Sequence, residues 1–272
     1  MSYGHKCIKI TGIVPAIMLM IVINSCSSDE SAHDILRRSI ASVDTVETIS
    51  YKQDMSRSNP RQIDDTIFRY REMYFKRLIR DSIVGVKGHW YFYNEDKTKV
   101  NYEDIYDGNK LIRKNNLDSS AILYDLIKYP EFKNEHFWSH NTPYALQYTF
   151  KHMLINQDTY VIERINDTSF MNKSCFQISI HLEDMMTMPG FAIKLEVMEG
   201  SIIKTIFIIE KATYYPLRMM EEYYSSANTG QKVFIDQTYY DIKFNPDLDE
   251  DILFNTSLDK LGGFEIEERK PH

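Results

Sequence analysis

Apolar and polar positions change their spacing several times along the chain, and each change predicts a new element. Residues 34–43 carry apolar side chains at helical spacing, so we predict a helix there. Strand-like alternation follows, with a strong turn signal at residues 107–109. This part predicts strands at residues 48–55, 67–78, 89–93, 99–106 and 111–113.

The second half of the chain changes character before it returns to strands. Apolar spacing predicts a short helix at residues 120–129, ended by Pro130, and a second helix at residues 143–156. Later strands are predicted at residues 174–182, 202–209, 217–224 and 232–244. No internal repeat or break in composition divides this series, so we expect one domain.

Several predicted strands have one apolar face, which we expect to turn inward. The clearest is 174–182, where residues 176, 178, 180 and 182 are apolar and their neighbours are polar or small. In 67–78 one face carries Phe68, Tyr70 and Tyr74 and the other carries Arg69, Arg71 and Arg77, and we expect the aromatic face inside. Covered by the helix at 143–156, such faces enclose either a filled core or a cavity for an apolar ligand. The candidate ligand-binding residues are Tyr70, Tyr74, Trp90, Phe92, Leu154, Phe176, Ile178 and Ile206.

The first residues have the pattern of a secretion signal. Lys6 and Lys9 precede an apolar run at 13–23, about half the roughly 20 residues that a membrane-spanning helix needs. The run ends in Ile23-Asn24-Ser25-Cys26, which resembles the lipobox of bacterial lipoproteins. The resemblance implies that residues 1–25 are removed and that Cys26 carries palmitate-like acyl chains. Residues 26–31 would form a polar tether and 32–272 the domain; the alternative is an uncleaved N-terminal anchor.

Composition narrows the fold and the partners. Nineteen Tyr and 14 Phe among 272 residues favour a β-rich protein over a helical bundle. The net charge of −7 becomes −9 once Lys6 and Lys9 are removed, and an acidic chain is a poor partner for nucleic acid. Cys7 leaves with the signal and Cys26 takes the lipid, so Cys175 has no partner for an intramolecular disulfide. We expect a monomer anchored to the membrane.

Candidate catalytic and metal-binding motifs are weak. His136 and His140 have a spacing that zinc sites use, without a nearby cysteine pair. The acidic run at 247–251 resembles the start of a calcium loop but lacks its glycine and its final glutamate. Nucleotide-binding and hydrolase motifs are also missing from the sequence. We therefore expect neither an enzyme, nor a cofactor, nor a metal site.

Short motifs connect the chain to a known family. Residues 106–110 (YDGNK), 209–211 (IEK), 215–218 (YPLR) and 239–254 resemble motifs of LolA/LolB-like domains carried by secreted lipoproteins, often ahead of a thioredoxin-like domain. The resemblance spans about residues 32–270. It implies an α+β, mainly antiparallel fold: an incomplete, curled β-barrel covered by a few helices. No Cys-x-x-Cys motif is present, so redox catalysis does not follow from it.

Two functions remain open at the level of sequence. The first is an envelope lipoprotein whose half-barrel binds a lipid or a lipoprotein acyl chain, with Ser27 pointing to the outer membrane. The second is a passive envelope module that binds a protein or glycan through its surface. Three triplets also resemble an O-glycosylation signal of some Gram-negative bacteria. They are Asp44-Thr45-Val46, Asp65-Thr66-Ile67 and Asp81-Ser82-Ile83.

Overall fold

The computed structural model describes residues 30–59, 62–79, 85–132, 143–187, 195–225 and 232–270. The chain divides into two compact units, Met1–Ser31 and Ala32–His272. All the helices and strands described here belong to the second unit. None of its described helices has the length and hydropathy that crossing a membrane requires.

Helices and strands follow one another as a helix, six strands, a helix, six strands, two short helical turns and a last strand. The helical segments are α1 (Ala32–Asp44), α3 (Pro143–Ile155), α4 (Glu250–Leu253) and the 3-10 turn η1 (Leu258–Leu261). The first strands are β1 (Thr48–Asn59), β2 (Gln62–Arg77), β3 (Val86–Tyr93), β4 (Val100–Tyr106), β5 (Lys110–Asn115) and β6 (Ser120–Asp125). The later strands are β7 (Val161–Arg164), β8 (Thr168–Phe170), β9 (Lys173–Thr187), β10 (Leu195–Glu210), β11 (Pro216–Ser225), β12 (Lys232–Phe244) and β13 (Glu265–Glu268).

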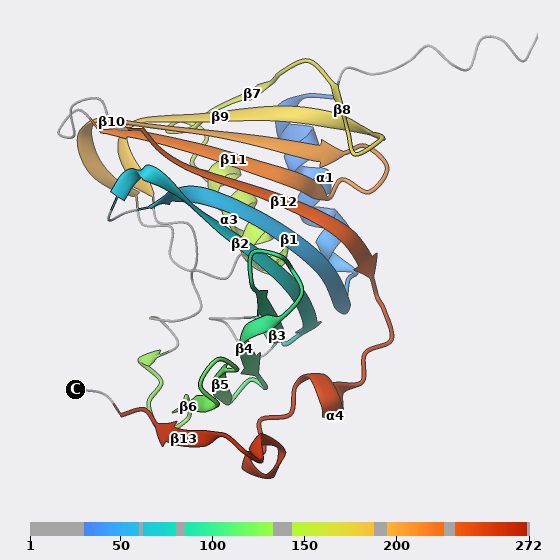
Figure 1. Ribbon diagram of the computed structural model, residues 1–272. Helices are drawn as coiled ribbons and strands as arrows, with labels where there is room; N and C mark the ends of the chain where they lie inside the picture. The colour runs from blue at the N-terminus through green and yellow to red at the C-terminus, as the bar shows by residue number, and fades with distance from the viewer. Residues whose placement is uncertain are drawn as a thin grey trace, which may run out of the picture. The chain divides into compact units, whose positions relative to one another are not determined.

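These strands form one sheet that curls without closing. The order is β13-β6-β5-β4-β3-β2-β1-β12-β11-β10-β9-β7, with β8 also paired to β9. Every pair is antiparallel except β13 with β6. Strands β1 and β12, far apart in sequence, lie side by side and join the two halves of the sheet (Figure 1). Because β7 and β13 are not paired to each other in this order, the barrel is incomplete.

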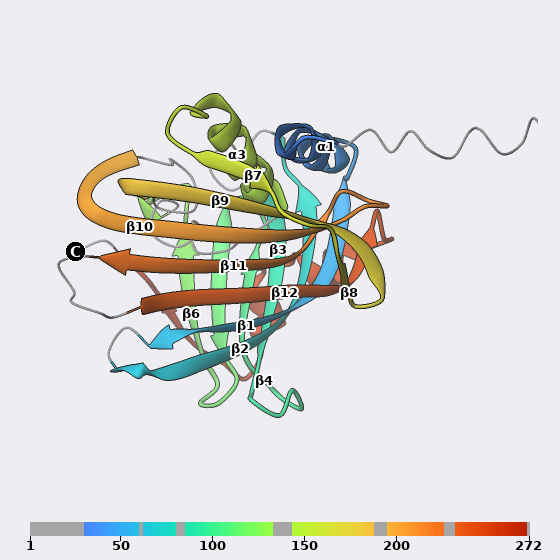
Figure 2. The same cartoon turned by 90° about the horizontal axis from the view of Figure 1, so that it is seen from above.

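Helices α1 and α3 pack on the concave face of the curled sheet, toward one end (Figure 2). The side chains of α1 and α3 join one large apolar core with those of the sheet. Phe150 of α3, for example, meets Phe207 of β10 edge to face, with 4.9 Å between the ring centroids. The helices therefore fill the concave face at this end with packed side chains.

Most of the predicted elements are confirmed. The predicted helices at 34–43 and 143–156 are α1 and α3, and the predicted strands correspond to β1–β5 and β9–β12. The hairpin turn between β4 and β5 is also present: Gly108 has φ of +105°, and Asp107 Oδ1 accepts a hydrogen bond from the Asn109 amide at 2.7 Å. The predicted mainly antiparallel, incomplete barrel with a few helices is the fold observed.

The predicted helix at 120–129 is wrong. Residues 120–125 are strand β6, in antiparallel register with β5 and parallel register with β13. Ala121 and Leu123 pack against Leu261 on one face, while Tyr124 enters the main core from the other. Alternate residues of this segment face opposite sides of the sheet, and pairing with two neighbouring strands stabilises the strand despite the helical spacing of its apolar residues.

The core at the end of β3 depends on one glycine. Gly88 carries no side chain, and the indole of Trp90 lies over it, with Cη2 only 2.4 Å from where a Cβ would stand. Trp90 is fully buried and meets Phe75 edge to face, with ring centroids 5.2 Å apart. Gly88 therefore makes room for the largest fully buried side chain among the residues that the structure describes.

We expect Gly88→Ala to lower the free energy of unfolding by about 1–3 kcal/mol, since the added methyl overpacks a closed core. Gly262→Ala is the control, because a Cβ at Gly262 has no atom within 4 Å. Urea titrations of both variants measure the difference. Equal stabilities of the two variants would show that Trp90 does not lie over Gly88.

Candidate functional site

A cavity of about 710 Å³ opens on the concave face, beside the packed core. Seven neighbouring strands of the sheet, in the order β11, β12, β1, β2, β3, β4 and β5, contribute its walls. Its volume lies within the roughly 300–1,000 Å³ of ligand pockets. Its apolar wall includes Met55, Phe92, Tyr102, Met219 and Ile235, and its polar wall includes Arg57, Arg69, Arg71, Asn101, Asp104, Arg113, Glu221 and Gln237.

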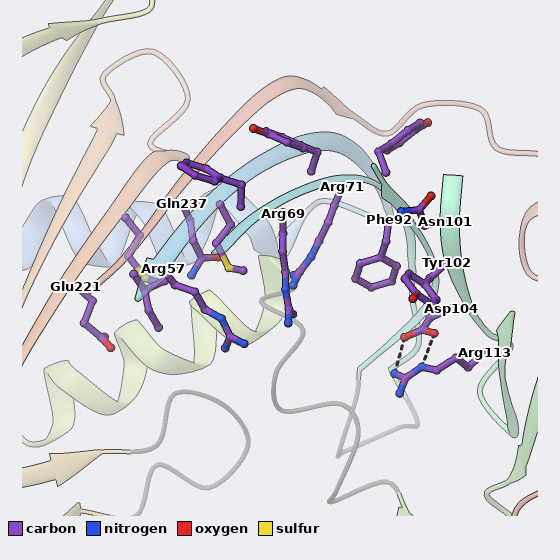
Figure 3. Close-up of a pocket in the computed structure, with 16 residues that line it drawn as sticks. Arg57, Arg69, Arg71, Phe92, Asn101, Tyr102, Asp104, Arg113, Glu221 and Gln237 are labelled. Atoms are coloured by element: carbon purple, nitrogen blue, oxygen red, sulfur yellow. Dashed lines mark hydrogen bonds and ion pairs between the residues drawn. The ribbon is translucent and has the colours of Figure 1, made fainter. Parts of the chain in front are cut away.

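Strand register brings three arginines together in this cavity. Arg69 and Arg71 are two residues apart on β2, so they share one face about 7 Å apart along the strand. Arg57 on β1 stands opposite Ile67, diagonal to Arg69, at about 7–8 Å between the backbones. All three side chains extend from the sheet in the same direction in Figure 3. The cavity thus has a local cluster of positive charge in a protein with a net charge of −7.

Arg71 forms the floor of the cavity. Its residue exposure is 7%, its Nη1 donates to Gln53 Oε1 at 3.3 Å, and its guanidinium lies 5.1 Å from the centroid of the Phe92 ring. Gln53 in turn donates to Gln237 at 2.6 Å. Burial and the charge of Arg69 lower the pKa of Arg71 to about 10. The side chain is therefore cationic at neutral pH but held in a setting that disfavours its charge.

Arg57, Arg69 and Arg71 have no carboxylate partner among the residues described. The Nε atoms of Arg57 and Arg71 are buried and make no hydrogen bond there. Burial, with a further contribution from Arg57, also lowers the pKa of Arg69. Four other arginines of the described chain pair with an aspartate: Arg37 with Asp34, Arg113 with Asp104, Arg164 with Asp167 and Arg218 with Asp236.

Two carboxylates also line the cavity, and neither pairs with the three arginines. Asp104 is buried and accepts a bidentate pair of hydrogen bonds from Arg113, at 2.9 and 2.8 Å (Figure 3). Glu221 accepts a bond from Thr205 Oγ1 at 3.4 Å, and burial raises its pKa. Ile235 stands between Glu221 and Arg57 in the register of the sheet. Neither carboxylate thus forms an ion pair with the three arginines, although the charge of Asp104 raises the pKa of Arg71 against the larger effect of burial.

Five of the candidate ligand-binding residues lie on the concave face. Phe92 lines the cavity. Trp90, Phe176 and Ile178 are buried in the neighbouring core, and Leu154 is half-buried against it. The structure thus brings these five residues to the concave face, four of them as packed core rather than cavity wall.

The expectation that Tyr74 and Ile206 face inward is wrong, whereas Tyr70 lines the rim of the cavity. In β2 the inward face carries Arg71, Met73 and Phe75, so Tyr74 points the other way. The Tyr70 ring lies under the Lys97 ammonium, at 4.3 Å from its centroid, although Tyr70 borders the cavity.

Tyr74 and Ile206 are held on the opposite face. Tyr74 donates a 2.6 Å hydrogen bond to Glu72. Ile206, flanked by buried Thr205 and Phe207 on β10, points away from the core. Tyrosine suits a solvent-facing strand because its hydroxyl keeps a polar partner there.

The sequence did not predict the three arginines of the cavity, because charged residues of a strand were expected to face solvent. A signal was present in the sequence: Arg69 and Arg71 alternate in phase with the apolar Met73 and Phe75 later in the same strand. The long apolar stem of arginine allows this phase, since it packs while the guanidinium reaches a polar cavity.

Other chemical candidates have structural roles or lie outside the described residues. Cys175 is a free, buried thiol, and burial raises its pKa. Asp249 caps helix α4, where its Oδ1 accepts from the Ile252 amide at 3.2 Å. Across the described residues no group of three or more metal-ligating side chains gathers. His136, His140, Cys26 and Asp81 fall outside the described ranges, whereas Thr45 and Asp65 of the other triplets are exposed.

Comparison with known proteins finds solved structures that are similar to this chain. The sequence matches no protein-family model and no curated protein. The chain is similar in fold to LolA-like proteins. A LolA superfamily protein from Nitrosomonas europaea has a TM-score of 0.33 and 10% identity, with 83% of this chain and 98% of that chain covered.

Two further solved structures are similar to the chain. The lipoprotein LppX of Mycobacterium tuberculosis has a TM-score of 0.45 and 8% identity, with 80% and 97% of the two chains covered. MucB has a TM-score of 0.45 and 10% identity, with 82% of this chain covered. The chain spans 62% of the length of MucB.

Proposed function

We propose that this protein is a non-catalytic envelope lipoprotein, anchored through Cys26, whose half-barrel binds an apolar ligand such as a lipid or a lipoprotein acyl chain. The observation that supports this function best is the cavity of about 710 Å³ on the concave face. Its wall includes five large apolar side chains, and burial of apolar surface is the main favourable contribution to binding an acyl chain. The neighbouring core consists of buried, packed apolar side chains, which hold the cavity wall in place.

The proposal includes a location and a state of assembly. The lipobox-like Ile23-Asn24-Ser25-Cys26 supports a lipid anchor, and Ser27 supports the outer membrane. The anchor would hold a monomer at the membrane that supplies its ligand, with the polar segment 27–31 between lipid and domain. LppX, similar in fold, is likewise a lipoprotein.

The cavity is tested by filling it. Ile235 is half-buried on its wall, so Ile235→Trp should occupy space that an acyl chain needs and weaken binding of a fluorescent long-chain fatty acid about tenfold or more. Ile206→Trp makes the same change on the opposite face and should leave the affinity within about twofold. Fluorescence titration at matched protein stability measures both. Equal affinities in the two variants would contradict binding in this cavity.

A further inference from the structure

Three buried or half-buried cations in one cavity require a physical explanation. Moving a charge out of water is costly unless the charge is paired, and like charges a few ångströms apart add to that cost. Arg57, Arg69 and Arg71 have no carboxylate partner in the described chain, although four arginines elsewhere do. A cluster of this kind is expected where an external anion completes it.

The arginines and the apolar wall face the same space. Arg69 and Arg71 lie on β2 between Met55 of β1 and Phe92 of β3 in the cross-strand register. Met219 and Ile235 follow on β11 and β12 on the other side of β1. A ligand in the cavity would therefore contact cationic and apolar surface at once, which is the chemistry of an anionic amphiphile.

The donor set favours a phosphate group over a carboxylate. Each guanidinium presents a planar fork of N–H donors that matches two oxygens of an anion. Three forks from two strands offer more donors than the two oxygens of one carboxylate accept, whereas a terminal phosphate monoester, as in phosphatidic acid, has three acceptor oxygens and a larger charge. Glu221, the nearby carboxyl, is separated from Arg57 by Ile235 in the register of the sheet, and burial raises its pKa.

We propose that Arg57, Arg69 and Arg71 bind the phosphate headgroup of a phospholipid-type ligand whose acyl chain lies along Met55, Phe92, Met219 and Ile235. This inference rests on the proposed function and names the class of its ligand. The two faces of the cavity then act together: the apolar wall supplies general affinity, and the arginines select lipids that carry a phosphate over neutral lipids of the same chain length.

Two soluble lipids that differ only in the phosphate test the headgroup site. We expect dioctanoyl phosphatidic acid to bind the wild-type protein about tenfold or more tightly than dioctanoylglycerol, since hydrogen bonds to a charged group are strong. Arg69→Gln should remove most of this preference and leave the dioctanoylglycerol affinity within about twofold. Arg37→Gln, on the exposed face of α1, is the matched loss of one positive charge and should preserve the preference. Isothermal titration calorimetry measures all six affinities.

The outcomes separate the headgroup site from the proposed function. Equal binding of both lipids by wild type, unchanged in Arg69→Gln, would overturn the arginine site and leave lipid binding intact. Failure of both lipids to bind would overturn the proposed function and this inference together. Inorganic phosphate that binds as tightly as the phosphatidic acid would mean a site for the free ion, against a lipid headgroup. Arg57→Gln is the second variant should Arg69→Gln unfold, and the same loss of preference is expected of it.

Discussion

Replacing Ile178 with alanine is expected to lower the free energy of unfolding by about 2–5 kcal/mol, the usual cost of truncating a core aliphatic residue. Ile178 has no exposed surface and lies in the main core. It stands opposite Phe207 on β10, which packs against Phe150 of α3. The truncation would therefore leave a cavity at the point where the sheet and the covering helix meet.

Gln177→Ala provides the matched control on the same strand. Gln177 is half-buried on the opposite face, and its truncation should cost less than about 1 kcal/mol. Urea denaturation with a common slope gives both values. A loss at Gln177 as large as that at Ile178 would contradict the register of β9.

Replacing Cys26 with serine is expected to abolish acylation and release the protein from the membrane. Each methylene of an acyl chain that enters the bilayer contributes about 0.8 kcal/mol, so two or three chains give a durable anchor and their loss removes nearly all of the membrane affinity. Labelling with palmitate and partition into detergent measure the two effects.

Cys175→Ser tests whether the effect belongs to position 26. Cys175 is buried in the sheet, so its replacement should leave labelling and detergent partition unchanged. A Cys26→Ser protein that still takes up palmitate and remains in membranes would contradict the lipobox assignment.

The sequence predicts this fold where alternation and burial agree. In β9 the apolar residues 176, 178, 180 and 182 are all buried, as their spacing required. The same rule failed in β2, where tyrosines occupy the outward face and arginines the inward one. Hydrophobicity ranks tyrosine above arginine, but it does not show which face has a polar cavity behind it. That information comes from the neighbouring strands, which bring Gln53 and Phe92 against Arg71.

Pairing across long sequence distances explains the other differences. Strand β6 is stabilised by β13, which follows it by 140 residues or more, so a local pattern could not reveal it. The cavity has the same origin. Arg57 and Met219 reach one space only because β1 pairs with β12 and β12 with β11. Local spacing indicates the apolar faces and the turns, whereas the arginines and the apolar wall share one space because of pairing between distant strands.

Native mass spectrometry of the protein purified from cell envelopes tests the central claim most directly, because it detects a bound lipid without assuming its identity. We predict one lipid per protein molecule, lost in Ile235→Trp and retained in Ile206→Trp. A well-folded wild-type protein that carries no lipid from the envelope, and binds none when long-chain lipids are added, would contradict the proposal that the half-barrel binds an apolar ligand.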